Sequence, residues 1–144
     1  MTQNTSVDLV LQIIHLHDKV QKKLARSLSA HGIGVSEFLV LKQLYAAANQ
    51  RLSRGELAEQ VGLSPSGVTR LLNPMEKIGL VDKEANPRDA RVSWVTLSSA
   101  GAQIYEDAQT SFTQAAVAML EPLKSTRLNA LVEGLKDATR VVVS

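Results

Sequence analysis

Arginines and small polar side chains are the candidate functional groups of this sequence, and they suit binding better than catalysis. The chain has no cysteine, which excludes disulfides, thiol nucleophiles and cysteine-ligated zinc. His15 and His17 are two positions apart, so they would point to different faces of a helix and could not chelate one ion together. No serine occupies a nucleophile-elbow motif, and we therefore predict neither an enzyme nor a metal or cofactor site.

Residues 86–91, Asn-Pro-Arg-Asp-Ala-Arg, form a turn-rich segment that carries Arg88 and Arg91. The planar cation of arginine is favoured by the strong negative potential inside a narrow minor groove of DNA. Asp89 lies between these arginines and would repel DNA if it faced it. We therefore expect Asp89 to pair with an arginine or to accept hydrogen bonds from loop amides.

A second candidate DNA contact is the outward face of a helix that we predict from Ser64. Its residues are small, polar or basic: Ser66, Gly67, Thr69, Arg70, Asn73 and Lys77. Hydroxyls near a helix start can reach phosphates and base edges, and Arg70 can form a bidentate contact with guanine or pair with a phosphate. Because a charged face alone is usually only solvated, this interpretation depends on the neighbouring arginine-bearing loop.

The charge of the chain supports a nucleic-acid partner only locally. The formal net charge is +2, and residues 50–97 hold seven basic and six acidic residues, a net +1. Glu56 and Glu59 fall on a supporting helix, and Glu76 falls late in the helix from Ser64, whose first turns carry no acid. The electrostatic signal therefore depends on where the cations lie.

The local sequence predicts the two helices that would position this face. Residues 53–56, Ser-Arg-Gly-Glu, fit the S-x-x-E capping box, in which both end residues satisfy free backbone amides. Gly62 suits the end of that helix, and Ser64-Pro65 suits the N-cap and first residue of the next. Ala58, Gly62 and Val68 then stand where a helix-turn-helix needs a small contact, a tight turn and an apolar anchor.

The helix from Ser64 contains Pro74, which departs from regular helix chemistry. A proline there removes a backbone donor and clashes with the carbonyl of Arg70, at a cost of about 3 kcal/mol. We expect a kink near residues 70–74, after the turns that would contact DNA, and we do not count Lys77 as a contact. The side chains predicted to face inward are Val68, Leu71, Leu72, Met75 and Ile78.

Strands and further helices complete the predicted fold. Residues 80–84 and 91–97 read as strands of a β-hairpin around the loop 85–90. Amphipathic helices are predicted from a capping box at Thr5 to about Ala30, from a cap at Ser36, after Ser98 or Ser99, and after Ser125. We interpret Trp94 and Tyr105 as core residues. The fold class is mainly α with a small β-hairpin wing (α+β), a winged helix-turn-helix.

Several motifs together resemble the MarR family of bacterial regulators, over nearly the whole chain. They are Leu-Ala-Glu-Gln-Val-Gly-Leu-Ser at 57–64, Val-Thr-Arg-Leu-Leu at 68–72, Gly-Leu-Val at 79–81, Asp89-x-Arg91 and Leu97-Ser98-x-x-Gly101. The last two motifs are the most specific.

The resemblance implies a homodimer with an N-terminal dimerisation helix (1–34), a winged helix-turn-helix DNA-binding domain (35–98) and C-terminal dimerisation helices (99–144). It also implies that the helix from Ser64 enters the major groove, that Arg91 enters the minor groove and that Asp89 braces the wing. A small aromatic or carboxylate effector is a further implication. The predicted DNA-binding residues are Arg54, Ser64, Ser66, Gly67, Thr69, Arg70, Asn73, Arg88, Asp89 and Arg91.

Two functions fit these observations: a ligand-responsive repressor on a palindromic operator, and a winged-helix module that binds a protein partner without DNA readout. Arg88, Arg91 and the acid-free helix start favour double-stranded DNA. No secretory signal is recognisable, and the most apolar stretch, residues 9–16, is too short to cross a bilayer. We therefore expect a cytoplasmic protein without a membrane partner.

Overall fold

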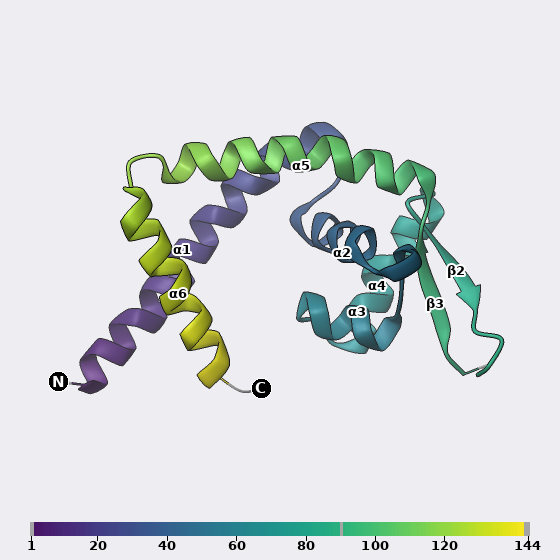
Figure 1. The fold of residues 1–144 in the computed structure, drawn as a ribbon, viewed down its shortest axis with the longest axis horizontal. Helices are drawn as coiled ribbons and strands as arrows, with labels where there is room; N and C mark the ends of the chain where they lie inside the picture. Colours follow the sequence, from purple (N-terminus) through teal and green to yellow (C-terminus); the bar gives the residue numbers. More distant parts are fainter. Residues whose placement is uncertain (1, 90, 143–144) are drawn as a thin grey trace.

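The long helix α5 (Ser99–Leu120) connects two groups of elements that lie toward its opposite ends (Figure 1). The computed structural model describes residues 2–89 and 91–142; Ala90 of the predicted loop lies outside them. Helices α2, α3 and α4 and the β-sheet gather near the N-terminal end of α5. Helix α1 (Thr2–Leu28) packs along α5, and its first half extends away together with α6 (Figure 1).

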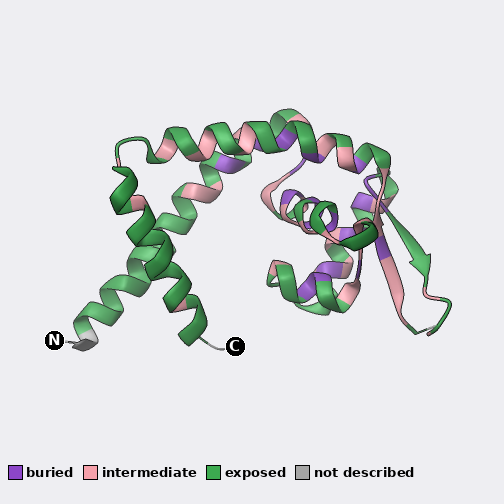
Figure 2. Ribbon diagram, in the orientation of Figure 1, coloured by how far each residue is buried: buried purple, intermediate pink, exposed green. Residues whose placement is uncertain are grey.

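The group near the start of α5 contains the hydrophobic core. Its helices are α2 (Val35–Ala46), α3 (Arg54–Val61) and α4 (Pro65–Lys77). Their apolar side chains meet those of the sheet and of α5 in one buried cluster, which includes Phe38 and Leu44. Figure 2 shows the buried residues concentrated in this group. Burial of one such side chain contributes about 1.5–3 kcal/mol, which explains why these short helices are stable together.

The sheet contains three antiparallel strands in the order β1 (Arg51–Ser53), β3 (Ser93–Leu97) and β2 (Val81–Ala85). The β2–β3 pair is the predicted hairpin, which is confirmed. Strand β1 is not predicted from the sequence. Its central residue Leu52 is buried and lies opposite Val95 of β3, so pairing and burial stabilise a segment too short to show an alternating pattern.

Helices α2 and α5 are joined by the two phenylalanines and the two tyrosines of the chain. Phe38 stacks on Phe112 and Tyr105, with ring centroids 4.6 and 5.5 Å apart, and Tyr45 lies 4.7 Å from Tyr105. Tyr105 is buried, as predicted, and burial raises its pKa. The Tyr45 hydroxyl donates to Glu106 Oε1 at 2.9 Å, and this hydrogen bond raises the pKa of Tyr45. These aromatic contacts fix the start of α5 to the core.

Two predicted helix starts are wrong. Helix α1 already includes Thr5, so Thr5 opens no capping box. The residue before α2 is Gly34, which makes no side-chain cap, in place of the predicted Ser36. The start at Ser98 is confirmed, because its hydroxyl oxygen accepts from the amide of Gly101 at 2.9 Å. The two failed starts carry cap-forming residue types inside the helices, where sequence alone cannot place the first turn.

Helices α1 and α6 (Ser125–Val141) carry apolar stripes that remain exposed (Figure 2). No residue of α6 is buried, and among the described side chains of α1 only Leu24 and Leu28 are buried. None of the described helices is both long enough and apolar enough to span a membrane. The exposed members of the two stripes include Val7, Leu9, Val10, Leu11, Ile13, Ile14, Leu16, Leu131, Val132 and Leu135.

Candidate nucleic-acid interface

The predicted helix-turn-helix consists of α3 and α4. Ser53 Oγ accepts from the amide of Glu56, and Glu56 Oε1 accepts from the amide of Ser53, both at 3.1 Å, so the capping box is confirmed. Gly62 ends α3 with a φ of 72°, which glycine adopts without strain. Ser64 Oγ then accepts from the amide of Gly67 at 3.1 Å and caps α4. These local bonds set the first turn of α4 relative to α3.

The inner face of α4 anchors it to the core. The predicted inward side chains that are buried are Val68, Leu72 and Met75, and Leu71 is half-buried. Ile78 is 65% exposed, so its predicted inward position is wrong. Helix α4 ends at Lys77, and the chain turns at Gly79 with a φ of 83°. Ile78 therefore no longer follows the inner face of the helix.

Helix α4 continues through Pro74 to Lys77 without an assigned break. Pro74 has no amide hydrogen, so the carbonyl of Arg70 loses its usual helical partner. Pro74 is exposed, which keeps its ring out of the core. The kink predicted near residues 70–74 stays a prediction, and the first turns of α4 precede the proline.

The outward face of α4 presents polar groups to solvent. Ser66, Arg70 and Asn73 are exposed. The hydroxyls of Ser64 and Ser66 lie 3.3 Å apart and share a hydrogen bond. Lys83 of β2 donates to Asn73 Oδ1 at 3.5 Å, which leaves the Asn73 amide hydrogens available to an acceptor. This face can therefore donate several hydrogen bonds to one partner.

Arg54 and Thr69, both predicted DNA contacts, are bonded to each other. Arg54 Nη1 donates to Thr69 Oγ1 at 3.1 Å, and Thr69 Oγ1 donates to the carbonyl of Pro65 at 3.1 Å. Both residues are half-buried, and Arg54 Nε is buried without a hydrogen-bond partner. The Arg54–Thr69 bond joins the first turns of α3 and α4, so it positions the outward face of α4.

The loop between β2 and β3 is organised by two side chains that accept backbone hydrogen bonds. Asn86 Oδ1 accepts from the amide of Arg88 at 2.9 Å. Asp89 Oδ1 accepts from the amide of Arg91 at 3.0 Å and from Arg91 Nε at 3.2 Å, so both predicted interactions of Asp89 are confirmed. The amide of Val92 donates to the Asp89 carbonyl at 3.1 Å, which is why β3 begins later than predicted. The Arg91 side chain is 91% exposed.

The part of the wing next to the loop contains a cluster that the sequence does not predict. The Arg51 guanidinium lies 4.8 Å from the centre of the Trp94 ring, and Arg51 Nη1 is 3.6 Å from Glu84 Oε1. Trp94 is half-buried, so its predicted core position is wrong. Strand β1 brings Arg51 beside Trp94, and no signal in the sequence indicates this contact because β1 itself has none.

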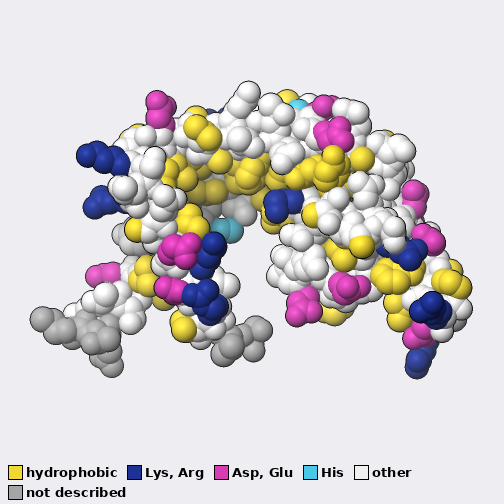
Figure 3. Space-filling model, viewed as in Figure 1, with side chains coloured by type: hydrophobic (Ala, Val, Ile, Leu, Met, Phe, Trp, Pro, Cys, Tyr) yellow, Lys and Arg dark blue, Asp and Glu magenta, His cyan; other side chains and the backbone are white. Residues whose placement is uncertain are grey.

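Charged groups are unevenly distributed over this surface. Figure 3 shows Lys and Arg side chains at the end of the wing and Asp and Glu side chains over α3. Glu56 and Glu59 of α3 are exposed. An anionic partner would therefore approach the start of α4 and the wing. Across residues 2–89 and 91–142, no three His, Asp or Glu side chains group as a metal site.

A helix-turn-helix followed by a β-hairpin with exposed arginines defines a winged helix-turn-helix protein. The model of the MarR family matches residues 33–93, which run from just before α2 to the first residue of β3. The match covers 61 of the 144 residues and shows that this part of the chain is similar to the MarR family.

Known proteins with similar sequences or folds support this assignment. The HTH-type transcriptional regulator PrsX of Escherichia coli is 29% identical over 94 residues, 65% of this chain and 57% of PrsX, so the chain matches little more than half of that relative. A structure of mutant MarR from E. coli complexed with operator DNA has a TM-score of 0.86 and 25% identity, over 94% of this chain and 96% of MarR. CouR from Rhodococcus jostii, bound to p-coumaroyl-CoA, has the same fold, with a TM-score of 0.83, 20% identity and 96% coverage of both chains.

Proposed function

We propose that this chain is a sequence-specific, double-stranded DNA-binding transcriptional regulator and not an enzyme. The observation that carries the proposal is the exposed polar and basic start of α4 beside a wing that holds Arg91 91% exposed. Hydroxyl, amide and guanidinium donors of this kind suit phosphate oxygens and base edges. The chain would act in the cytoplasm, where its DNA partner lies.

In this proposal α4 lies in the major groove and the wing reaches the minor groove. The α4 contacts are Ser64, Ser66, Gly67, Thr69, Arg70 and Asn73. Arg88 and Arg91 contact the minor groove and its phosphates, and Asp89 holds the Arg91 side chain in place. Arg54 acts mainly through Thr69, because its Nη1 is engaged there at 3.1 Å. Arg70 is free of such a bond among the described residues and is the strongest candidate for a direct base contact.

We further propose a homodimer formed through residues 1–34 and 99–144, with residues 35–98 as the DNA-binding domain. The exposed apolar stripes of α1 and α6 support this division, because a second copy would bury them. Two-fold symmetry would set two α4 helices about 34 Å apart, one turn of DNA, on a palindromic operator. Such a dimer would repress transcription by blocking polymerase access. A small aromatic or carboxylate effector would weaken DNA binding.

The function is tested by selecting binding sites from genomic DNA with the purified protein, which reads out palindrome and spacing together. Arg91→Ala should then weaken binding to the selected operator by about 1–3 kcal/mol, because one minor-groove cation is lost. Lys42→Ala, on the exposed surface of α2 and outside both the proposed DNA contacts and the proposed dimer segments, is the matched control and should leave the affinity unchanged. Equal gel-shift affinity of the wild type and Arg91→Ala would contradict the role given to the wing.

A further inference from the structure

The side chain of Lys83 joins the wing to the outward face of α4. Lys83 Nζ donates to Asn73 Oδ1 at 3.5 Å and lies 3.9 Å from Glu76 Oε1. Asn73 and Glu76 are three residues apart in α4, so their side chains are neighbours on the same side of that helix. Lys83 is not one of the predicted DNA contacts, yet it is bonded to one of them.

The register of the sheet explains why Lys83 reaches α4. Lys83 lies opposite Val95 in the β2–β3 pair and follows Val81 by two positions, and both valines are buried. Because successive side chains of a strand alternate between the two faces of a sheet, Lys83 shares the inner face with these valines. Strand β2 packs against α4 on this side. The Lys83 side chain is 39% exposed, so its ammonium keeps contact with water.

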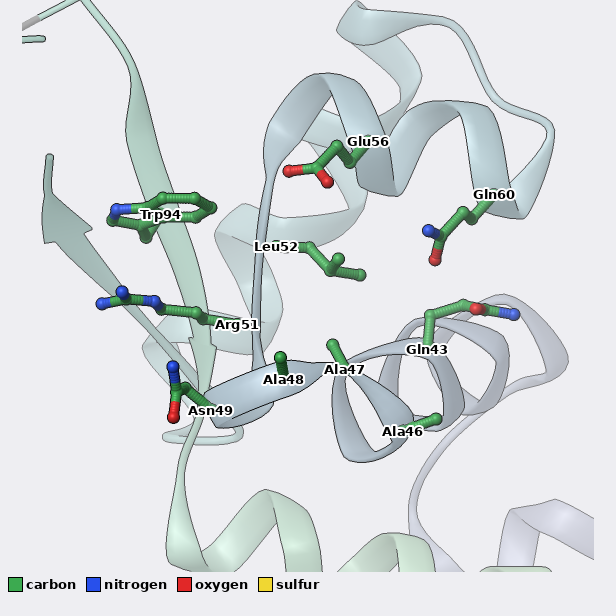
Figure 4. A pocket seen from close by; sticks show the side chains of 10 residues that line it. All are labelled: Gln43, Ala46, Ala47, Ala48, Asn49, Arg51, Leu52, Glu56, Gln60 and Trp94. Carbon is green, nitrogen blue, oxygen red and sulfur yellow. The ribbon is translucent and has the colours of Figure 1, made fainter.

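Arg51 belongs to the opposite face of the same sheet. It lies opposite Thr96, the neighbour of Val95 in β3, and its guanidinium stacks on Trp94 at 4.8 Å. Figure 4 shows this guanidinium pointing away from the hollow between α2, β1 and α3. Arg51 and Lys83 are thus both cations of the sheet, but the contact with α4 belongs to Lys83.

The bond from Lys83 fixes which end of the Asn73 amide is turned toward β2. A lysine ammonium has three donors and no acceptor, so only Oδ1 of the amide can face it. The Nδ2 group then lies on the side of the amide away from Lys83. Asn73 is exposed, so its two amide hydrogens are open to another molecule. Toward a partner on this face of α4, the side chain therefore acts as a donor.

Base edges in the major groove differ in how well they match a group that only donates. Guanine presents two neighbouring acceptors, O6 and N7, whereas adenine presents the acceptor N7 beside the N6 donor. An asparagine pairs with adenine through both ends of its amide, because Nδ2 donates to N7 and Oδ1 accepts from N6. With Oδ1 held by Lys83, adenine loses one of these two bonds, while guanine still offers two acceptors.

We infer that Lys83 determines part of the operator specificity: by holding Asn73 Oδ1, it makes Asn73 select guanine over adenine at the base pair that faces it. Lys83 is a positioning residue in this role, because it acts through Asn73 and does not touch the base. The inference rests on the proposed function, since it requires that α4 lies in the major groove.

The test begins by locating the base pair that Asn73 faces. Binding sites are selected with the wild type and with Asn73→Ala, and the pair in question is the one whose preference disappears in the variant. Gel shifts then compare operators that carry each of the four bases at this pair in both half-sites. The wild type should bind the guanine operator about tenfold more tightly than the adenine operator.

Lys83→Met keeps an unbranched side chain but removes the donor. Oδ1 of Asn73 is then free to accept from adenine, so the preference for guanine should fall below about twofold or pass to adenine. Lys83→Arg retains a group that only donates and should keep the preference. Arg51→Met, which removes a cation from the other face of the sheet, is the matched control and should keep it as well.

Equal binding of the guanine and adenine operators by the wild type overturns the inference. It is also overturned if Asn73→Ala keeps every base preference of the wild type, if Lys83→Met keeps the preference for guanine, or if Arg51→Met loses it to the same extent as Lys83→Met. A wild type that selects no DNA site at all overturns the proposed function instead.

Discussion

Leucines near the two ends of α5 differ sharply in burial. Near its start, Leu44 and Leu57 are completely buried by α2, α3 and their neighbours. Toward its end, Leu131 and Leu135 of α6 are 50% and 48% exposed. Both sets recur at helical spacing, so the sequence pattern alone does not distinguish them. One apolar stripe is therefore buried within the chain, while the other is left exposed, where the proposed dimer would cover it.

The largest expected effect concerns the exposed apolar stripe of α6. Leu135→Asp should raise the dimer dissociation constant on the order of 100-fold, because each of two copies loses a buried leucine at the interface. Ala130→Asp, on the other side of α6, is the control for added charge and should leave the dimer intact. Light scattering over a dilution series measures both. A wild type that remains a monomer at high concentration would contradict the proposal that a second chain covers the exposed stripe of α6.

A smaller effect comes from adding one methyl group at each end. A Cβ on Gly101 would collide with the carbonyl oxygen of Leu80 and the side chain of Leu97. Gly101→Ala should therefore lower the free energy of unfolding by about 1–3 kcal/mol, since packed backbone must move. In α6, Gly134 has open space around it, and Gly134→Ala should stabilise the helix by about 0.5–1 kcal/mol. Urea denaturation at one fixed protein concentration gives both values, and the same sign for both would refute the contrast.

The smallest effect concerns the pH dependence of stability and comes from Tyr105, which is buried near the start of α5. Burial raises the pKa of Tyr105 in the folded chain above its unfolded value. Its contribution to stability is therefore complete below about pH 10 and is lost as the pH rises through the folded pKa. Tyr105→Phe should reduce the alkaline loss of stability measured by urea denaturation between neutral and strongly alkaline pH. An identical alkaline slope in the two proteins would show that Tyr105 ionises freely.

The elements of the fold were predictable where local chemistry decides them. The capping box at Ser53, the caps at Ser64 and Ser98 and the turn at Gly62 each involve residues within a few positions of one another. The wing hairpin was predictable for the same reason, and so was the bonding of Asp89 to Arg91. The predicted DNA-binding residues themselves stay a prediction until binding is measured.

Other features depend on contacts between distant segments. Ile78 follows the inward spacing of α4, yet the chain turns away before it can pack, so it is exposed. Arg54 is a predicted DNA contact, but its guanidinium donates a hydrogen bond to Thr69 and so supports α4. Neither outcome could be inferred from periodicity, because each depends on the relative placement of two elements.

The helices, their turns and the hairpin can be predicted from the sequence, since hydrogen bonds between near neighbours and apolar periodicity encode these elements directly. In contrast, the strand Arg51–Ser53 and the contacts of Arg51 with Trp94 and Glu84 arise only when distant segments pack together. A three-residue strand has no stability of its own. It exists because β3, some forty residues further along the chain, offers it hydrogen-bond partners and an apolar neighbour for Leu52.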